Sequence, residues 1–266
     1  MKIGLCASMN VDDLSMGGSE LAPIIAEMGY DYIELSLSHL SLLNDVQLDQ
    51  LVNRLDKIGL PCESCNNFFP PLLKLTGSDV HWKEIERYVL GALRKAAQIG
   101  TKIVVFGSGP AKTIPDNFPR ELAYQQLVEL CCIIDPIARE TGIVVAIEPL
   151  KKAECNIINT VEEGLQLMRD ANCLNIRVLA DYYHMRNEGE NPDILLKAGQ
   201  DLRHVHFAKI QDRTFPLSIE EDSQYVIFFE KLKRIGYDQR ISVEAFTNNF
   251  HTEAKQSLAL IKKLIN

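Results

Sequence analysis

Four polar residues end short apolar runs in the sequence, and their types suit metal binding. Glu148 ends VVAIE, Asp181 ends RVLAD, His206 ends HVH and Glu244 ends ISVE. Three carboxylates and one imidazole form a donor set for a hard or borderline divalent ion, and the set contains no thiolate. A single carboxylate at such a position is more often a helix cap or a surface ion pair, so the prediction depends on all four together. They predict one divalent metal site, with Mn²⁺ as the preferred ion and Mg²⁺, Co²⁺ or Zn²⁺ as alternatives.

The neighbouring residues offer one alternative ligand and three further polar groups. His204 lies two residues before His206 and faces the same side of an extended strand. We favour His206 because it is closer to the end of the strand. Glu154, His184 and Arg213 each follow a predicted ligand within seven residues. They could hold the hydroxyl groups of a substrate, although Glu154 and Arg213 could equally be solvated loop charges and His184 could cap a turn.

Eight apolar runs of strand length must position these side chains. They read KIGLCAS from Lys2, YIELS from Tyr32, CESCNNFF from Cys62, KIVVFG from Lys102, IVVAIEPL from Ile143, IRVLADYYH from Ile176, HVHFAK from His204 and RISVEAF from Arg240. Continuous Val and Ile runs indicate strands that are covered on both faces, which is typical of a parallel sheet with helices outside.

Amphipathic segments of helical period separate these runs. We expect helices over residues 19–28, 46–58, 82–99, 120–141, 160–171, 192–198, 223–235 and 252–265. A glycine directly follows five of these segments, at the position where a helix often ends in a left-handed conformation. These glycines are Gly29, Gly59, Gly100, Gly142 and Gly236. Eight strand–helix units in 266 residues predict a single-domain (β/α)8 TIM barrel over residues 1–266.

The barrel would bring the four predicted ligands together. Functional groups of this fold lie at the carboxyl ends of the strands and in the loops that follow. The four residues are separated by 33, 25 and 38 positions, about one strand–helix unit each. Four consecutive strands would therefore aim them at a common point.

Composition and charge limit the partners of the protein. The 28 basic and 36 acidic residues give a net charge of −8, and no Lys/Arg run could neutralise several phosphates, so nucleic acid is not expected. The start MKIGLCAS lacks the features of a signal peptide, and no apolar run approaches the roughly 18 residues of a membrane span. Seven scattered cysteines are typical of reduced thiols, and we expect a cytoplasmic protein that does not enter the membrane.

Three short motifs carry weaker signals. Cys62 and Cys65 have the spacing of a redox motif, but they lie in a predicted strand with no helix opening after it, so no redox or zinc role is expected. The stretch NNFFPP over residues 66–71 could shape a pocket, face a second subunit or simply pack. The segment GSG over residues 107–109 is too weak a signal for a phosphate site.

The chain resembles the sugar isomerase/epimerase superfamily of xylose isomerase-like barrels, and within it most closely the ketose 3-epimerases. The resemblance covers the whole chain and is most specific in IEPL with INTVEEGLQLM, in ADYYHM, in HVHFAKIQDR and in IGYDQRISVEAF. It implies a metal held by Glu148, Asp181, His206 and Glu244, and a sugar substrate contacted by Glu154, His184 and Arg213. It also implies a homodimer or homotetramer. Arg213 is displaced by one position from the family pattern, and the first strand lacks the aromatic residue that often packs on the sugar.

The resemblance implies C3 epimerisation of a ketose through a cis-enediolate, with Glu148 and Glu244 as acid and base. A proton beside a carbonyl is removed at neutral pH only when the developing negative charge is stabilised, which a divalent cation can do. One carboxylate would remove the proton and the other would return one to the opposite face. Aldose–ketose isomerisation, dehydration of a keto-inositol and β-elimination of a glycoside begin in the same way and remain alternatives. A metal-dependent endonuclease or a non-catalytic sugar-binding barrel agrees less well with six histidines, a net charge of −8 and two intact carboxylates.

Overall fold

Each of the eight predicted apolar runs forms a β-strand in the computed structural model, which describes residues 1–266. The strands are β1 (Lys2–Cys6), β2 (Tyr32–Ser36), β3 (Cys62–Asn66), β4 (Ile103–Phe106), β5 (Val144–Ile147), β6 (Ile176–Asp181), β7 (Leu202–Phe207) and β8 (Arg240–Val243). They are parallel and adjacent in chain order, and β1 also pairs with β8, so that the sheet closes into a barrel. The predicted single-domain TIM barrel is confirmed.

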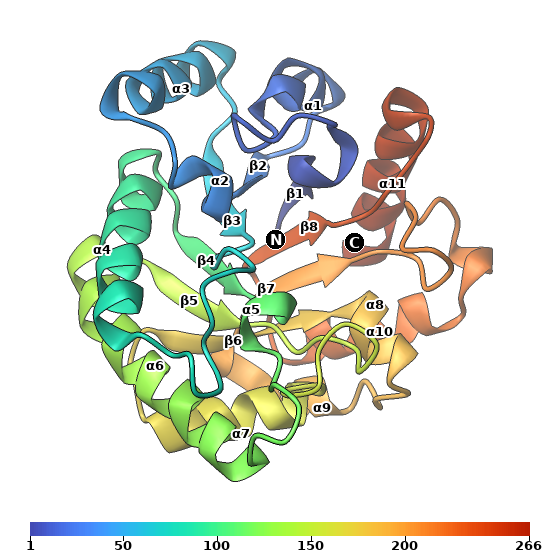
Figure 1. Ribbon diagram of the computed structural model, residues 1–266. Coiled ribbons are helices and arrows are strands. Elements are labelled where there is room, and N and C mark those ends of the chain that lie inside the picture. The colour runs from blue at the N-terminus through green and yellow to red at the C-terminus, as the bar shows by residue number, and fades with distance from the viewer.

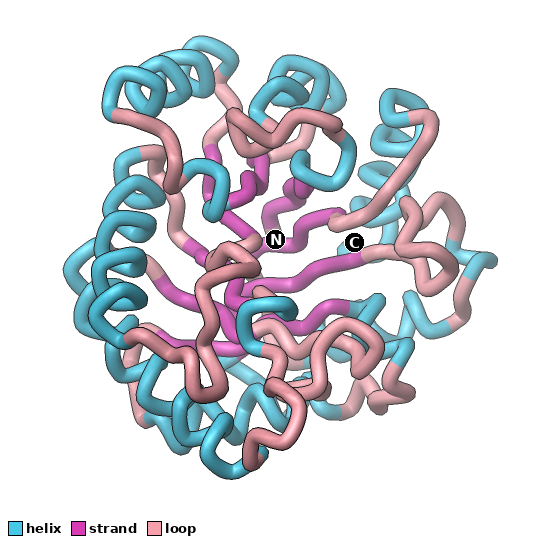
Figure 2. The backbone as a smooth tube through the Cα atoms, in the orientation of Figure 1, coloured by secondary structure: helices cyan, strands magenta, loops and turns pink.

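Helices surround the barrel on the outside, and the strands form its inner ring (Figures 1 and 2). The longer helices are α1 (Ala22–Met28), α3 (Asp45–Ile58), α4 (Trp82–Gln98), α6 (Arg120–Thr141), α7 (Val161–Ala171), α10 (Gln224–Arg234) and α11 (Phe250–Ile265). The shorter ones are α2 (Leu37–Leu40), α5 (Gly109–Lys112), α8 (Tyr182–Asn187) and α9 (Ile194–Ala198), with 3-10 turns at Ala7–Asn10, Ser19–Leu21, Gly199–Asp201 and Ile219–Glu221.

Local sequence signals account for several helix ends. Helix α3 starts at a capping box, in which the Asn44 side chain accepts from the Gln47 backbone N–H and the Gln47 side chain accepts in return from the Asn44 N–H. It ends at Gly59, whose φ of 73° is left-handed. Thr160 caps α7, with its hydroxyl accepting from the Glu163 N–H at 3.1 Å. These caps fix where each helix begins and therefore where the preceding loop can turn.

The sixth strand ends at the predicted residue, Asp181, but the segment after it differs from the prediction. We expected His184 to lie in a loop, whereas helix α8 begins at Tyr182. The Asp181 side chain accepts a hydrogen bond from the Tyr183 N–H at 2.8 Å, which caps the new helix. Consequently His184 lies on a helix directly above the strand end. The short helices α2 and α5, which follow β2 and β4, were also not predicted.

The inside of the barrel is apolar on one side and polar on the other. Ile103, Val105, Ala146 and Leu179 form a small buried cluster, separate from the large core of 76 residues. Across from them lie Tyr32, Glu34, Ser64, His204 and Ser242, all fully buried. The alternation of strand side chains explains the pattern, since residues two apart face the same side of the sheet. His204 and Ser242 lie two residues before His206 and Glu244, so this polar layer lies beneath the strand ends.

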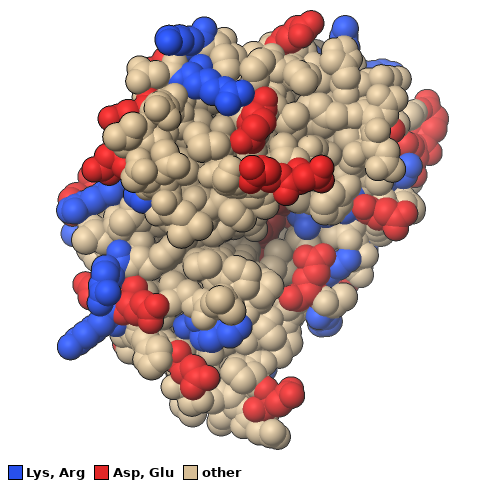
Figure 3. All heavy atoms as spheres, turned by 45° about the horizontal axis from the view of Figure 1, so that its top comes forward, with Lys and Arg blue, Asp and Glu red and all other residues tan.

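The apolar character of the helices and the charge of the surface both concern possible partners. None of the helices combines the length and the apolar character that a membrane span requires. The face in Figure 3 carries Lys, Arg, Asp and Glu side chains of both signs, scattered among uncharged residues. That face therefore presents no continuous basic stripe.

Candidate metal centre

The four predicted ligands meet at the carboxyl end of the barrel. Glu148, Asp181, His206 and Glu244 each offer a ligand atom, and these atoms lie within 4.8 Å of one another. The Nδ1 atom of His206 lies 3.0 Å from Glu148 Oε1 and 2.8 Å from Glu244 Oε2. All four side chains are buried. Although His204 was the alternative ligand, it lies outside this group.

Strand geometry explains the convergence. Asp181 is the last residue of β6, and His206 is the next-to-last residue of β7. Glu148 and Glu244 directly follow β5 and β8. Because the strands are parallel and adjacent, their carboxyl ends lie at one mouth of the barrel.

One permanent cation, Arg213, contacts the cluster. Its guanidinium donates to Asp181 Oδ2 at 2.9 Å and to Glu244 Oε2. Burial raises the pKa of Asp181 to about 7, although Arg213 opposes the shift. Burial also acts to raise the pKa of Glu244, but Arg213 and His206 lower it below its ordinary value. Burial and then the nearby Glu244 raise the pKa of Glu148.

The imidazole of His206 carries part of the positive charge that the carboxylates require. Burial disfavours its charged form, yet the carboxylates of Glu244 and Glu34 raise its pKa well above the usual value. The cluster thus holds three buried carboxylates against one guanidinium and one imidazole. This donor set of three oxygens and one nitrogen suits a divalent cation, which would supply the missing positive charge.

A buried carboxylate that was not predicted, Glu34, lies beneath the centre. It comes from β2 and accepts from His206 Nε2 at 2.9 Å and from His204 Nε2 at 2.8 Å. Burial alone would raise the pKa of Glu34, but the two imidazoles lower it well below its usual value. The rule that found the other four also applies here, because Glu34 nearly ends the run YIELS. It was not predicted, because two further residues, Leu35 and Ser36, follow it in that run.

Three more residues hold the carboxylates in place. Asn66 ends β3, and its amide donates to Glu244 Oε1 at 2.8 Å. Lys112 is fully buried, and its ammonium donates to the backbone carbonyl of Glu148 at 2.9 Å. Gly107 leaves space for Glu148, because a Cβ atom at this position would lie 2.0 Å from Glu148 Oε2. Lys112 had no signal in the sequence. Asn66 begins the 66–71 stretch and Gly107 begins the GSG segment, but neither was predicted to support the metal ligands.

The predicted substrate residues border the same centre. His184 Nδ1 accepts from the Lys151 N–H at 3.2 Å, so its Nε2 carries the hydrogen when the ring is neutral. Burial, reinforced by Arg213, lowers the pKa of His184 well below its usual value. Its Nε2 is buried without a hydrogen-bond partner, 3.4 Å from Asp181 Oδ2 and 4.0 Å from Glu154 Oε2. A neutral N–H without a hydrogen-bond partner is therefore buried beside Asp181 and Glu154.

The cavity above the centre has a volume of about 250 Å³, and most of its nine lining residues are polar or charged. Glu148, Glu154, Arg213 and Glu244 line it together with Asn67, Ser108, Gly109, Pro110 and Leu150. The aromatic residues of the 66–71 segment do not line it: Phe68 and Phe69 are buried and pack against one another at 4.2 Å between ring centroids. A small, polar cavity with one hydrophobic wall residue suits a hydrophilic ligand such as a sugar.

Comparison with known sequences identifies relatives of this chain. The xylose isomerase-like TIM barrel family matches residues 23–264. A probable ketose 3-epimerase from Synechocystis is 25% identical over 231 residues, which cover 82% of this chain and 75% of that protein. The 3-dehydro-D-guloside 4-epimerase of Escherichia coli is 28% identical over 198 residues, which cover 69% of this chain and 71% of that protein.

Solved structures share the fold. The crystal structure of D-psicose 3-epimerase with D-tagatose from Clostridium cellulolyticum H10 superposes with a TM-score of 0.86 and 19% sequence identity. The match covers 100% of both chains. The arrangement of all eight strand–helix units is therefore common to the two proteins.

Proposed function

The chain belongs to the xylose isomerase-like TIM barrel family, and on this premise we propose that it is a divalent-metal-dependent epimerase that inverts carbon 3 of a ketose. The observation that carries the proposal is the convergence of Glu148, Asp181, His206 and Glu244 beneath a small polar cavity. Ketose 3-epimerases among the relatives make a sugar with a carbonyl group the first choice of substrate.

The four residues would hold the metal ion, and the chemistry of the donor set supports this assignment. When bound, a divalent cation supplies a Lewis acid that stabilises negative charge on oxygen. Three anionic ligands and one imidazole satisfy a hard or borderline ion, Mn²⁺ first among them. Arg213 adds a fixed positive charge beside Asp181 and Glu244.

Glu148 and Glu244 are the proposed acid and base. They come from β5 and β8 and approach the same nitrogen of His206, at 3.0 and 2.8 Å. Their pKa values are displaced in opposite directions, because Glu244 has the Arg213 partner and Glu148 has mainly burial and the charge of Glu244. Such a pair can keep one carboxyl protonated while the other is ionised. One removes the proton from the sugar carbon beside the carbonyl, and the other delivers a proton to the opposite face of the resulting enediolate.

His184, Arg213 and Glu154 are the proposed binding groups for sugar hydroxyls. The His184 Nε2–H lacks a partner and can donate to a hydroxyl oxygen, which would satisfy a buried polar group. Arg213 is held over the ring of Tyr183, with 5.0 Å between the guanidinium carbon and the ring centroid. Glu154 is partly exposed, lies 3.4 Å from Lys151 Nζ and can accept from a hydroxyl at the cavity entrance.

Proton exchange tests the proposal directly. Metal-loaded protein is incubated in deuterated water with a panel of free ketoses, and NMR follows the loss of the carbon-bound proton and the appearance of the epimer. Exchange should disappear with a chelator and return with Mn²⁺. Glu148→Gln and Glu244→Gln should each reduce it by at least about 100-fold, because a positioned acid or base contributes that much.

The metal content of each variant is measured in the same samples. The variant Glu63→Gln serves as a matched control, because Glu63 lies on β3 and pairs with Lys2 and Arg240, away from the centre. It should keep the exchange rate of the unmodified protein. Near-normal exchange in either Glu148→Gln or Glu244→Gln would refute the acid–base pair.

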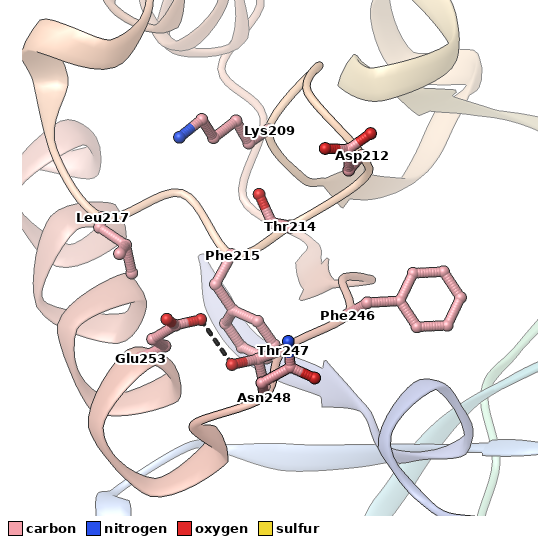
Figure 4. A pocket seen from close by; sticks show the side chains of 9 residues that line it. All are labelled: Lys209, Asp212, Thr214, Phe215, Leu217, Phe246, Thr247, Asn248 and Glu253. Carbon is pink, nitrogen blue, oxygen red and sulfur yellow. Dashed lines mark hydrogen bonds between the residues drawn. The ribbon is translucent and has the colours of Figure 1, made fainter.

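A second candidate function, C4 epimerisation of a keto-glycoside, is favoured by an outer cavity of about 640 Å³ (Figure 4). Asp212 and Thr214 line it, whereas Arg213 between them lines the inner cavity, so the two cavities share this segment as a wall. Phe246, which is 50% exposed, also lines the outer cavity and offers an aromatic face to a second sugar ring. Adding a methyl 3-keto-hexopyranoside to the panel separates the candidates. Exchange on the glycoside but on no free ketose would select the second.

A further inference from the structure

Glu34 is a fully buried carboxylate that the proposed reaction does not use. It reaches across the barrel from β2 to β7 and β8 and lies between His204 and His206. Its Oε1 atom is 2.9 Å from His206 Nε2. Its Oε2 atom is 2.8 Å from His204 Nε2 and accepts from the Ser242 hydroxyl at 2.5 Å. Both oxygens of Glu34 are therefore occupied.

These hydrogen bonds decide which nitrogen of His206 is available. An ionised carboxylate can only accept, so the hydrogen between Glu34 and His206 belongs to Nε2 of the ring. The other nitrogen, Nδ1, then faces Glu148 at 3.0 Å and Glu244 at 2.8 Å. Nδ1 is thus the atom that can join these carboxylates around a cation. A rotated ring would lose the Glu34 contact and turn its N–H toward the cluster.

The network holds Glu34 itself in one place. The Ser242 hydroxyl that donates to Glu34 is in turn 2.7 Å from the Tyr32 hydroxyl. The ring of Tyr32 fills the space over Gly4, where a Cβ atom would lie 2.2 Å from the ring. All these groups are buried, so water does not compete for the carboxylate. The position of the His206 ring is consequently fixed from below by a chain of packed residues.

A different role for Glu34, as a metal ligand, agrees less well with the contacts. Cys6, Glu34 and His206 also offer ligand atoms within 4.8 Å of one another. However, Glu34 already accepts three hydrogen bonds, whereas Glu148 and Glu244 line the open cavity. A cation at Cys6 and Glu34 would have to displace the donors from His204 and Ser242.

We propose that Glu34 is the positioning residue of the metal centre: it holds the His206 ring with Nδ1 toward Glu148 and Glu244 and makes that nitrogen a stronger donor. The inference rests on the metal-binding role proposed above for the four-residue cluster. A carboxylate that accepts from a ligating histidine typically contributes 10–100-fold, as an order of magnitude, to metal affinity.

Metal affinity tests this role without reference to turnover. The dissociation constant for Co²⁺ is measured by competition with a chromophoric chelator for the unmodified protein, Glu34→Gln, Glu34→Ala and the control Glu63→Gln. Glu34→Ala should bind Co²⁺ about 10–100-fold more weakly. Glu34→Gln keeps an acceptor for the His206 N–H but loses the charge, so its affinity for Co²⁺ should lie between those of the unmodified protein and Glu34→Ala. Glu63→Gln should bind like the unmodified protein, and unchanged affinity in Glu34→Ala would overturn the inference.

A second measurement needs no variant and so does not depend on whether Glu34→Ala folds. In the unmodified protein, loaded with Zn²⁺ and labelled with ¹⁵N at histidine, NMR reports which ring nitrogen of His206 carries the hydrogen. We expect a protonated Nε2 and a metal-bound Nδ1. A metal-bound Nε2, or a thiolate-to-cobalt charge-transfer band that reports Cys6 as a ligand, would overturn the proposal. If the unmodified protein binds no metal, both the proposed function and the role of Glu34 are refuted. If the unmodified protein and the Glu34 variants bind metal equally well, only the role of Glu34 is refuted.

Discussion

Substituting Gly107 by alanine should disable the centre without unfolding the protein. Gly107 directly follows β4, and a Cβ atom there would lie 2.0 Å from Glu148 Oε2. Contacts shorter than 3.0 Å to a Cβ atom essentially do not occur, so the carboxylate would have to retreat by about 1 Å. This retreat would disturb the 3.0 Å contact between Glu148 Oε1 and His206 Nδ1.

The magnitude follows from that displacement. A misplacement of about 1 Å in a catalytic group can cost about 100-fold in rate. This factor corresponds to about 2.7 kcal/mol of transition-state stabilisation, since each tenfold is about 1.36 kcal/mol. The backbone at Gly107 is not left-handed, so alanine fits its conformation, and the free energy of unfolding should change little.

The assay is the proton exchange described above, with thermal unfolding of the same samples. Gly91→Ala is the matched control, because Gly91 lies on the exposed side of α4 and a Cβ atom there meets nothing within 4 Å. Gly91→Ala should keep full exchange and gain up to about 1 kcal/mol from its better helix propensity. Exchange at the unmodified rate in Gly107→Ala would refute the reasoning that Glu148 must occupy this position.

Two further predictions concern substrate binding and stability. His184→Gln should raise KM about 10-fold and leave kcat and metal affinity nearly unchanged, because losing one hydrogen bond costs about 1.4 kcal/mol. Steady-state kinetics measure both constants, and a fall in kcat alone would contradict a binding role. Glu63→Gln should lower the free energy of unfolding at pH 7 by about 1–3 kcal/mol, because its carboxylate pairs with Lys2 and Arg240 across β1, β3 and β8. Burial alone would raise the pKa of Glu63, but these partners lower it, so its contribution is present above about pH 4.5 and is lost as the pH falls through the lower folded pKa. Denaturant unfolding should thus show the difference between the two proteins closing below about pH 4, and a difference that persists in acid would contradict the ion-pair explanation.

The sequence could place the four residues predicted as metal ligands at one site, because a repeated fold gives local patterns a spatial meaning. Apolar runs of strand length and amphipathic segments report only their own neighbourhood, but eight such units imply a closed barrel. Once that is inferred, the polar residues that end strands are known to share one mouth. Glu148, Asp181, His206 and Glu244 were placed in this way, and the structure brings them within 4.8 Å.

Local signals were insufficient directly after the sixth strand. The sequence predicted that Asp181 ends this strand, but it did not indicate the helix α8, which the Asp181 side chain caps. Asp181 therefore has two functions, as a helix cap through Oδ1 and as a partner of Arg213 through Oδ2. The helix places His184 with its Nδ1 against the Lys151 N–H.

The sequence by itself determined the barrel, the order of its units and the four residues at the mouth, because hydrophobic periodicity and strand ends are properties of short segments. Only the tertiary structure decided which groups support them. Glu34 meets His206 across 172 positions of the chain, and Asn66 meets Glu244 across 178. Lys112 reaches the Glu148 carbonyl from a helix that was not predicted. Gly107 supports the site because its lack of a side chain leaves space for the Glu148 carboxylate. Such contacts depend on the width and closure of the barrel, which no local pattern of residues records.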